Sequence, residues 1–153
     1  MSKPMNSYPD SWYVASSPML AEQPPASGDL AYDVCVVGGG YAGLSCALHL
    51  AKSGKSVAVL EAERVGWGAS GRNGGHVGTG QRAGQHSLEK WYGKATAKEL
   101  WRLGLEAVDL VSNLVEENGI DCELGRTNIH FAAKKSHADE LRDEVDHLRA
   151  DYN

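Results

Sequence analysis

The sequence lacks the features that mark nucleic-acid-binding and membrane-spanning proteins. Its 153 residues carry a formal net charge of −5, and no run of Lys or Arg forms a basic stripe, so nothing favours nucleic-acid binding. The longest apolar runs are only a few residues, too short to cross a bilayer. The first residues lack the apolar centre of a signal peptide. The sequence therefore gives no support for nucleic-acid binding or for a membrane span.

Cysteine is scarce, and no catalytic or metal-ligand pattern is evident. Cys35, Cys46 and Cys122 are odd in number, widely spaced and set among apolar neighbours. This pattern predicts buried, reduced thiols in a cytosolic protein rather than a disulfide framework or a metal site. His76 and His86 are interpreted as polar loop residues. No Ser-His-Asp or paired-carboxylate arrangement is present, so the sequence assigns no catalytic residue and no metal.

Glycine, by contrast, is abundant. The chain has 18 Gly, about 12% against a usual usage of about 7%. They cluster at 38–43 and 66–84, which indicates sites that depend on the backbone. All five Pro lie within residues 1–31, which are predicted to form an N-terminal tail or extended arm. Its aromatic residues leave two interpretations open, an arm packed on the rest of the chain or a loose tail.

The first cluster lies within a predicted β–α–β unit. Residues 33–37 form a short, nearly continuous apolar run, typical of a strand in a buried parallel sheet. Apolar residues at helical spacing predict a helix over 42–53, which Gly54 would end. A second parallel strand is predicted over 56–61. The fold class is therefore α/β.

The rest of the chain is predicted to be mainly helical. Residues 62–86 hold eight Gly and are expected to be irregular. The capping-box spacing of Thr96–Glu99 predicts the start of a long amphipathic helix that ends near Gly119. The apolar pattern then predicts two strands and one more helix, over 121–124, 127–133 and from about Ser136.

Residues 38–43 read Gly-Gly-Gly-Tyr-Ala-Gly and fit the G-x-G-x-x-G pattern. Gly38 allows the tight turn after the strand, and Gly40 lets the backbone approach a pyrophosphate. Gly43 lets the helix pack close to the strand. The pyrophosphate would meet the N–H groups at the positive end of the helix dipole. The motif is weak alone, but here it follows a predicted strand and opens a predicted helix.

Glu61 ends the second predicted strand, 18 residues after Gly43. A carboxylate at this position accepts hydrogen bonds from the hydroxyls of an adenosine ribose. It would repel a 2′-phosphate, so NADP is disfavoured. FAD and NAD share this first motif and acid, and both remain candidates at this point.

A second glycine-rich loop distinguishes the two. Residues 66–75 read Gly-Trp-Gly-Ala-Ser-Gly-Arg-Asn-Gly-Gly, and the larger flavin benefits from such a second stretch of accessible backbone. With the strand and acid before it, Arg64–Gly75 resembles the N-terminal region of the D-amino-acid oxidase superfamily of FAD-dependent oxidoreductases. The resemblance is nearest to the gamma-glutamylputrescine oxidase branch. Its specific part is confined to residues 34–75.

The resemblance implies roles for the matching residues. Glu61 would hold the adenosine ribose with Ala62 beside the adenine, and Arg64 and Ser70 would lie near the phosphates. Donor groups of Arg and Ser and exposed backbone N–H groups suit phosphate oxygens. The residues expected around the pyrophosphate are Gly38, Gly40, Tyr41, Ala42 and Gly43. Those expected to approach the flavin ring are Arg72, Asn73, Gly74 and Gly75.

The resemblance also implies an organisation and a reaction. Residues 1–31 would be an arm, 32–120 the N-terminal part of a Rossmann-like FAD-binding domain, and 121–153 the start of a substrate domain. Family members are longer, so the chain is expected to be an incomplete part that is inactive alone and binds FAD poorly. They oxidise an amine to an imine by hydride transfer to the flavin, usually with molecular oxygen as acceptor.

Two other functions stay open at this stage. One is the Rossmann domain of a NAD-dependent dehydrogenase, against which the second glycine loop argues. The other is a non-catalytic nucleotide-binding fragment. It differs from the FAD-dependent oxidoreductase interpretation only in what lies beyond residue 153. Neither the amine substrate nor the oligomeric state is evident from the sequence.

Overall fold

A computed structural model describes residues 8–18, 20–125 and 127–152. The chain divides into two compact units, the first ending at Gly75 and the second beginning at His76. Helices and strands are mixed, with one small parallel sheet in the first unit. These two units are defined by their compactness. The division expected from the sequence, into an arm (1–31), a cofactor-binding part (32–120) and the start of a substrate domain (121–153), stays a prediction.

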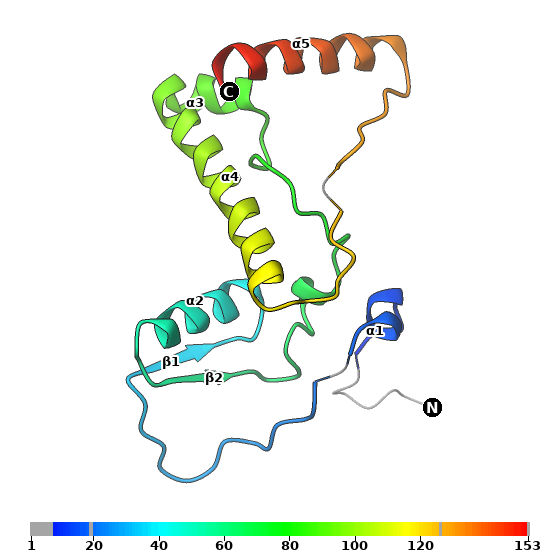
Figure 1. Ribbon diagram of the computed structural model, residues 1–153. Coiled ribbons are helices and arrows are strands. Elements are labelled where there is room, and N and C mark those ends of the chain that lie inside the picture. The colour runs from blue at the N-terminus through cyan, green and yellow to red at the C-terminus, as the bar shows by residue number, and fades with distance from the viewer. Residues whose placement is uncertain (1–7, 19, 126, 153) are drawn as a thin grey trace. The chain divides into compact units, whose positions relative to one another are not determined.

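The sheet of the first unit has the order expected from the sequence. Strand β1 (Val34–Val37) and strand β2 (Val57–Leu60) are parallel, with Val34 opposite Val57 and Val37 opposite Leu60. Helix α2 (Tyr41–Lys52) connects them and packs on both (Figure 1). Valine-rich runs favour strands because their branched side chains pack well on a pleated surface. Parallel neighbours require such a crossover connection.

The two faces of this sheet differ in cover. Val34 and Val36 point to the side that α2 covers, and Val36 lies next to Gly43 of that helix. Cys35 and Val37 point the other way because successive side chains of a strand alternate. Val37 is 83% exposed. Among the described residues of the first unit, α2 therefore covers one face of the sheet and leaves the other face exposed.

The prediction of buried cysteines is wrong. Cys35, Cys46 and Cys122 are all free and exposed. Cys35 belongs to the sheet face that α2 does not cover, and Cys46 lies on α2 itself. Cys122 follows the long helix in irregular chain. Their apolar neighbours suggested burial, but a two-stranded sheet with one helix encloses too little volume to bury them.

The N-terminal arm carries one turn of helix that its sequence did not indicate. Helix α1 (Trp12–Ser16) begins after Ser11, whose hydroxyl accepts a hydrogen bond from Val14 N. The Tyr8 hydroxyl donates to the carbonyl of Val65 at 2.6 Å, whereas Trp12 is 78% exposed. Tyr8 therefore bonds the arm to the chain that follows β2, while the Trp12 side chain is exposed.

The second unit is helical, and its helices begin earlier than predicted. Helix α3 (Gln85–Tyr92) and helix α4 (Lys94–Glu117) meet at Gly93, which has φ +80° and ends one helix as the other begins. The predicted start at Thr96 is therefore wrong, and α3 was not predicted. A left-handed residue turns the chain sharply, so Leu88 of α3 is buried, as is Ala97 of α4. Helix α5 (Lys135–Asp151) starts within one residue of its predicted position.

The two strands predicted at 121–124 and 127–133 are not formed in the described residues of this stretch. Glu123 has φ +50°, a left-handed conformation that interrupts an extended run. Ile129 and Phe131 are 73% and 86% exposed. Their alternating pattern favours a strand, but a strand needs a neighbour to pair with its backbone groups.

No helix in the described part of the chain has the length and apolar character needed to cross a membrane.

The contact between Gly43 and the loop before α2 yields a first prediction. A Cβ on Gly43 would overlap the carbonyl oxygen of Gly38, which is backbone and has little freedom to move. Gly43→Ala is expected to lower the free energy of unfolding by about 1–3 kcal/mol. Urea unfolding followed by far-ultraviolet circular dichroism measures it.

Gly84→Ala is the matched control for this prediction. Gly84 has extended backbone (φ −63°, ψ 157°), and a Cβ there would meet no atom of the described residues within 4 Å. Its unfolding midpoint is expected to stay near that of the unmodified chain. Equal midpoints for both variants would contradict the close-packing argument.

Candidate functional site

The glycine loop between β1 and α2 places backbone N–H groups at one end of the sheet. Gly38 has φ +104° and donates its N–H to the carbonyl of Leu60 at 2.7 Å, which extends the strand pairing by one residue. Gly39 then donates to a carboxylate oxygen of Glu61 at 2.6 Å. Gly40 is the N-cap of α2 and has no side chain to offer. The first amides of a helix lack partners within it, so this end of α2 suits an anion.

Ser70 takes the place of the missing N-cap side chain. Its hydroxyl accepts a hydrogen bond from Tyr41 N at 3.0 Å, although it lies 29 residues away in sequence. A Cβ on Gly40 would stand 3.0 Å from the same hydroxyl oxygen. A side chain at residue 40 would therefore push Ser70 away from the helix. The absence of a side chain at Gly40 lets the second glycine loop reach the start of α2.

The Glu61 carboxylate accepts hydrogen bonds both from the glycine loop after β1 and from the chain that follows β2. One carboxylate oxygen accepts from Gly39 N and the other from Glu63 N at 3.0 Å. The N–H groups of Glu63 and Gly39 lower the pKa of the Glu61 carboxyl below its ordinary value of 4.5, because both bonds favour the charged form. The acid is thus held beside the glycine loop, at the end of β2, as its position in the sequence requires.

The second glycine loop is folded on itself and bonded to the first. Gly66 N donates to the carbonyl of Gly39 at 2.9 Å, and a short 3₁₀ helix η1 (Ala69–Gly71) follows. The Asn73 amide donates to the carbonyl of Ser70 at 2.8 Å, and its oxygen accepts from Gly75 N at 2.8 Å. The amide nitrogen of Asn73 also donates to the Tyr41 hydroxyl at 3.4 Å. Asn73 therefore fixes the turn that presents the last glycines.

The two arginines of the region contact other groups. Arg64 donates to the carbonyl of Leu20 at 2.7 Å, and its guanidinium lies 5.1 Å from the centre of the Tyr8 ring. Arg72 donates to the carbonyl of Trp67 at 2.7 Å and stacks over that ring at 4.2 Å. Arg64 thus ties the N-terminal arm to the loop. Ala62 and Gly74 are exposed.

Most of the predicted site residues lie in one continuous region of the first unit. The structure brings Ser70 and Asn73 to the start of α2 and brings Glu61 to the glycine loop. Gly39 was not among the predicted site residues, although its N–H holds Glu61. The signal was available in principle, because the middle residue of G-x-G contributes its backbone whatever its side chain. The bond between Gly66 and Gly39 has no such signal, because both groups are main chain.

The comparisons with known proteins place the chain among flavin enzymes. The family described as FAD dependent oxidoreductase (DAO) matches residues 33–153. The gamma-glutamylputrescine oxidoreductase of Escherichia coli is 42% identical over 119 residues, which cover 78% of this chain and 28% of the relative. A probable oxidoreductase OrdL of Haemophilus influenzae is 38% identical over 131 residues, or 86% of this chain and 30% of the relative.

A third relative, matched over a shorter stretch, is named as an oxidase. The glycine oxidase of Bacillus licheniformis is 37% identical over 79 residues, covering 52% of this chain and 21% of the relative. The chain thus spans about a third or less of the length of these relatives. No solved structure matches it.

The carboxylate of Glu61 yields a prediction on pH. Its folded pKa is lowered, so its contribution to stability is present above the ordinary value of 4.5 and is lost as the pH falls through the folded value. The free-energy difference between the unmodified chain and Glu61→Gln should be largest above pH 4.5 and shrink on acidification. Urea unfolding at a series of pH values measures it. Glu116→Gln, which changes an exposed acid on α4, is the matched control.

Proposed function

The chain belongs to the DAO family of FAD-dependent oxidoreductases, and we propose that its first unit is part of a Rossmann-like FAD site. The observation that carries the proposal is the junction of β1 and α2. Bare backbone at Gly38–Gly40 precedes the start of a helix, and an acid from the neighbouring parallel strand stands beside it. This arrangement combines an anion site with a hydroxyl acceptor, which together recognise a dinucleotide.

The glycine loop is proposed to hold the pyrophosphate. Gly40 leaves space that a Cβ would fill, and Gly43 lets α2 start close to the strand end. The N–H groups of the first turn other than that of Tyr41, which donates to Ser70, would face the phosphate oxygens. The residues proposed to surround the pyrophosphate are Gly38, Gly40, Tyr41, Ala42 and Gly43.

Glu61 is proposed to bind the adenosine ribose. An ionised carboxylate has about four acceptor positions, so its bonds to Gly39 and Glu63 leave others for ribose hydroxyls. Those two bonds also keep the carboxyl ionised and fixed in orientation. A charged acceptor so placed disfavours a 2′-phosphate. Ala62, exposed directly after it, is proposed to lie beside the adenine.

The second glycine loop is proposed to serve the phosphates and the flavin. Ser70 already lies at the first amide of α2, where a phosphate oxygen would bind. Arg64 uses one nitrogen for Leu20, and its guanidinium has five N–H donors in all. Stacking on Trp67 gives the Arg72 guanidinium a defined orientation. The residues proposed to approach the flavin ring are Arg72, Asn73, Gly74 and Gly75.

The proposed reaction of the whole protein is the oxidation of a small amine. A bound flavin would supply the acceptor for the hydride on the carbon beside the amine nitrogen; with loss of a proton from that nitrogen, the amine would become an imine, which water would hydrolyse. Molecular oxygen is the proposed final acceptor. The amine class follows the names of the E. coli and B. licheniformis relatives, which are oxidases or oxidoreductases of amine compounds. Residues 121–153 are proposed as the start of a substrate domain.

Cofactor binding by the chain itself is the first test. Equilibrium dialysis of the 153-residue chain is expected to show weak binding of FAD and weaker binding of NAD. Glu61→Ala should raise the Kd for FAD roughly tenfold to a hundredfold, because hydrogen bonds to a charged acceptor contribute about 1.5–3 kcal/mol.

Glu116→Ala is the control, since it removes an exposed acid from α4 in the second unit. Its Kd for FAD should equal that of the unmodified chain. Preference for NAD over FAD would favour a dehydrogenase domain instead. An equal effect of both substitutions would remove Glu61 from the site.

The chain alone is also expected to lack amine oxidase activity. It covers 28% of the E. coli relative's length, and the site proposed above binds cofactor rather than amine. Hydrogen peroxide release is the measurement, with FAD added and gamma-glutamylputrescine or glycine as substrate. Peroxide formed at a rate that depends on amine concentration would show that these residues include a substrate site.

A further inference from the structure

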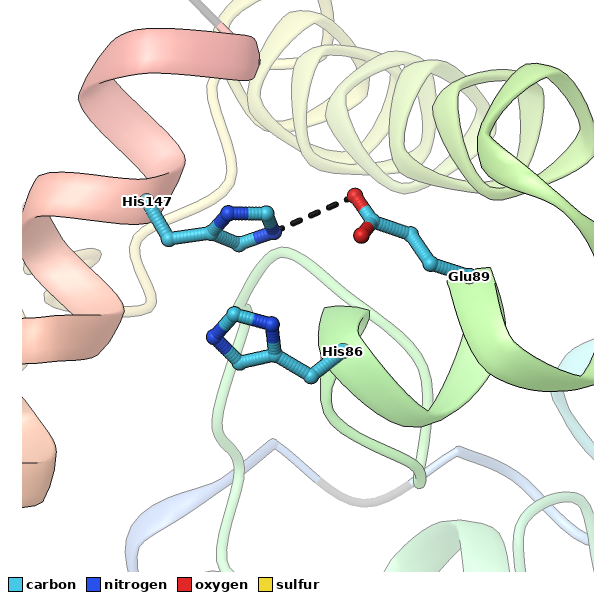
Figure 2. Close-up of side chains that lie close together, drawn as sticks. All are labelled: His86, Glu89 and His147. Atoms are coloured by element: carbon cyan, nitrogen blue, oxygen red, sulfur yellow. Dashed lines mark ion pairs between the residues drawn. The ribbon is translucent and has the colours of Figure 1, made fainter.

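The second unit holds a cluster of two imidazoles and a carboxylate that the flavin site does not use. His86 and Glu89 lie three residues apart on α3, and His147 reaches them from α5 (Figure 2). One candidate ligand atom from each of the three lies within 4.8 Å of the other two. We propose that His86, Glu89 and His147 bind a divalent transition-metal ion of the Zn²⁺ type.

The distances suit such an ion. Metal–ligand bonds of about 2.0–2.1 Å at tetrahedral angles separate neighbouring ligand atoms by about 3.3 Å. His147 Nε2 lies 3.1 Å from Glu89 Oε1. The rings of His86 and His147 are stacked with centres 4.0 Å apart. Because the His86 side chain is exposed, its ring has room to turn one nitrogen toward the other two ligand atoms.

His147 presents a nitrogen that lacks a hydrogen bond. Its Nε2 is buried and has no hydrogen-bond partner among the described residues, even though Glu89 is near. A buried polar atom without a partner is unfavourable, and a metal ion would satisfy it. The His147 side chain is 15% exposed, so water reaches it only to a limited extent. This nitrogen therefore points to a ligand.

Groups outside the three ligands hold two of them in position. The other His147 nitrogen, Nδ1, lies 3.5 Å from Asp151 Oδ2, and Asp151 is paired with Lys94 at 2.5 Å. The Tyr152 hydroxyl donates to Glu89 Oε1 at 2.5 Å. Histidine ligands commonly present their second nitrogen to a carboxylate in this way, which fixes the ring orientation. Asp151 and Tyr152 are thus positioning residues for the site.

The charge and chemistry of the surroundings favour a cation with affinity for nitrogen. A cavity next to the cluster is lined by Glu140, Asp143 and Glu144 as well as by the two histidines. Imidazole ligands suit Zn²⁺ and its neighbours in the first transition row, whereas Mg²⁺ and Ca²⁺ prefer oxygen alone. Two imidazoles and one carboxylate leave a fourth position for water. The ion would connect α3 to α5 independently of any flavin.

The sequence contains this cluster in a form that is hard to find. His86 and Glu89 are an i, i+3 pair, and His147 and Asp151 are an i, i+4 pair, so each pair shares one helix face. The two pairs are far apart in the sequence, with residues 90–146 between them. The prediction that His86 is a polar loop residue is wrong, since His86 lies on α3. The sequence alone does not indicate that His147 of a distant helix lies beside it, so no metal site was predicted.

The test is metal binding by the metal-free 153-residue chain. Titration with Zn²⁺ in competition with a chromophoric chelator should give one ion per chain, and bound Zn²⁺ should raise the Tm. His147→Ala and Glu89→Gln should each weaken binding more than tenfold. Asp151→Asn should weaken it about tenfold, as is usual for a group that orients a ligand. His49→Ala, an exposed histidine of α2, should leave binding unchanged.

One control variant excludes binding by the thiols, and a second variant covers the case in which His147→Ala does not fold. A variant with Cys35, Cys46 and Cys122 all replaced by Ser should bind Zn²⁺ as the unmodified chain does, since the thiols are exposed and would otherwise compete. If His147→Ala loses helix content, Glu89→Gln decides, because its amide oxygen still accepts from Tyr152. No binding by the unmodified chain, binding unaffected by Glu89→Gln, or binding lost in the cysteine variant would each overturn the proposal.

Discussion

At Gly43 the backbone of α2 lies against the carbonyl of Gly38, with no room for a Cβ between them. This contact fixes how soon the helix starts after β1, and therefore where its first N–H groups lie. The neighbouring features depend on it. Ser70 reaches Tyr41 N only because Gly40 has no side chain, and Glu61 reaches Gly39 N only because the loop is this tight. A bulkier loop would displace the first N–H groups of the helix from the acid beside them.

The sequence predicted the local structure of the first unit well, since strand β1, helix α2 and strand β2 follow from residues close together in the chain. Glycine spacing and the acid after β2 likewise predicted that Glu61 lies beside the glycine loop, whereas the cofactor roles of these residues stay a prediction. Interactions between distant residues were not predictable. Gly66 and Gly39 join the two loops through main-chain groups, and Arg64 meets Tyr8 and Leu20 of the arm, without any pattern that links them.

The second unit departed further from prediction, for two physical reasons. Gly93 ends α3 and starts α4 in a left-handed conformation, which outweighed the capping-box spacing at Thr96. Ile129 and Phe131 have the alternation of a strand, yet no strand forms there, because a periodic pattern does not supply a pairing partner. Burial was misjudged for the same kind of reason, since apolar neighbours around a cysteine indicate a core only where other elements enclose it.

The face of the two-stranded sheet that α2 does not cover carries a thiol whose reactivity reports on the exposure of that face. Cys35 lies on that face and is a free, exposed thiol, with Val37 two residues along at 83% exposure. The rate at which Cys35 reacts with a thiol reagent therefore measures how often this surface is open to solvent. Cys46, on α2 in the same unit, provides an internal reference. A segment that packs onto the face of Cys35 and Val37 would slow alkylation of Cys35 but not of Cys46. Mass spectrometry of the two cysteine peptides would therefore follow the packing over time.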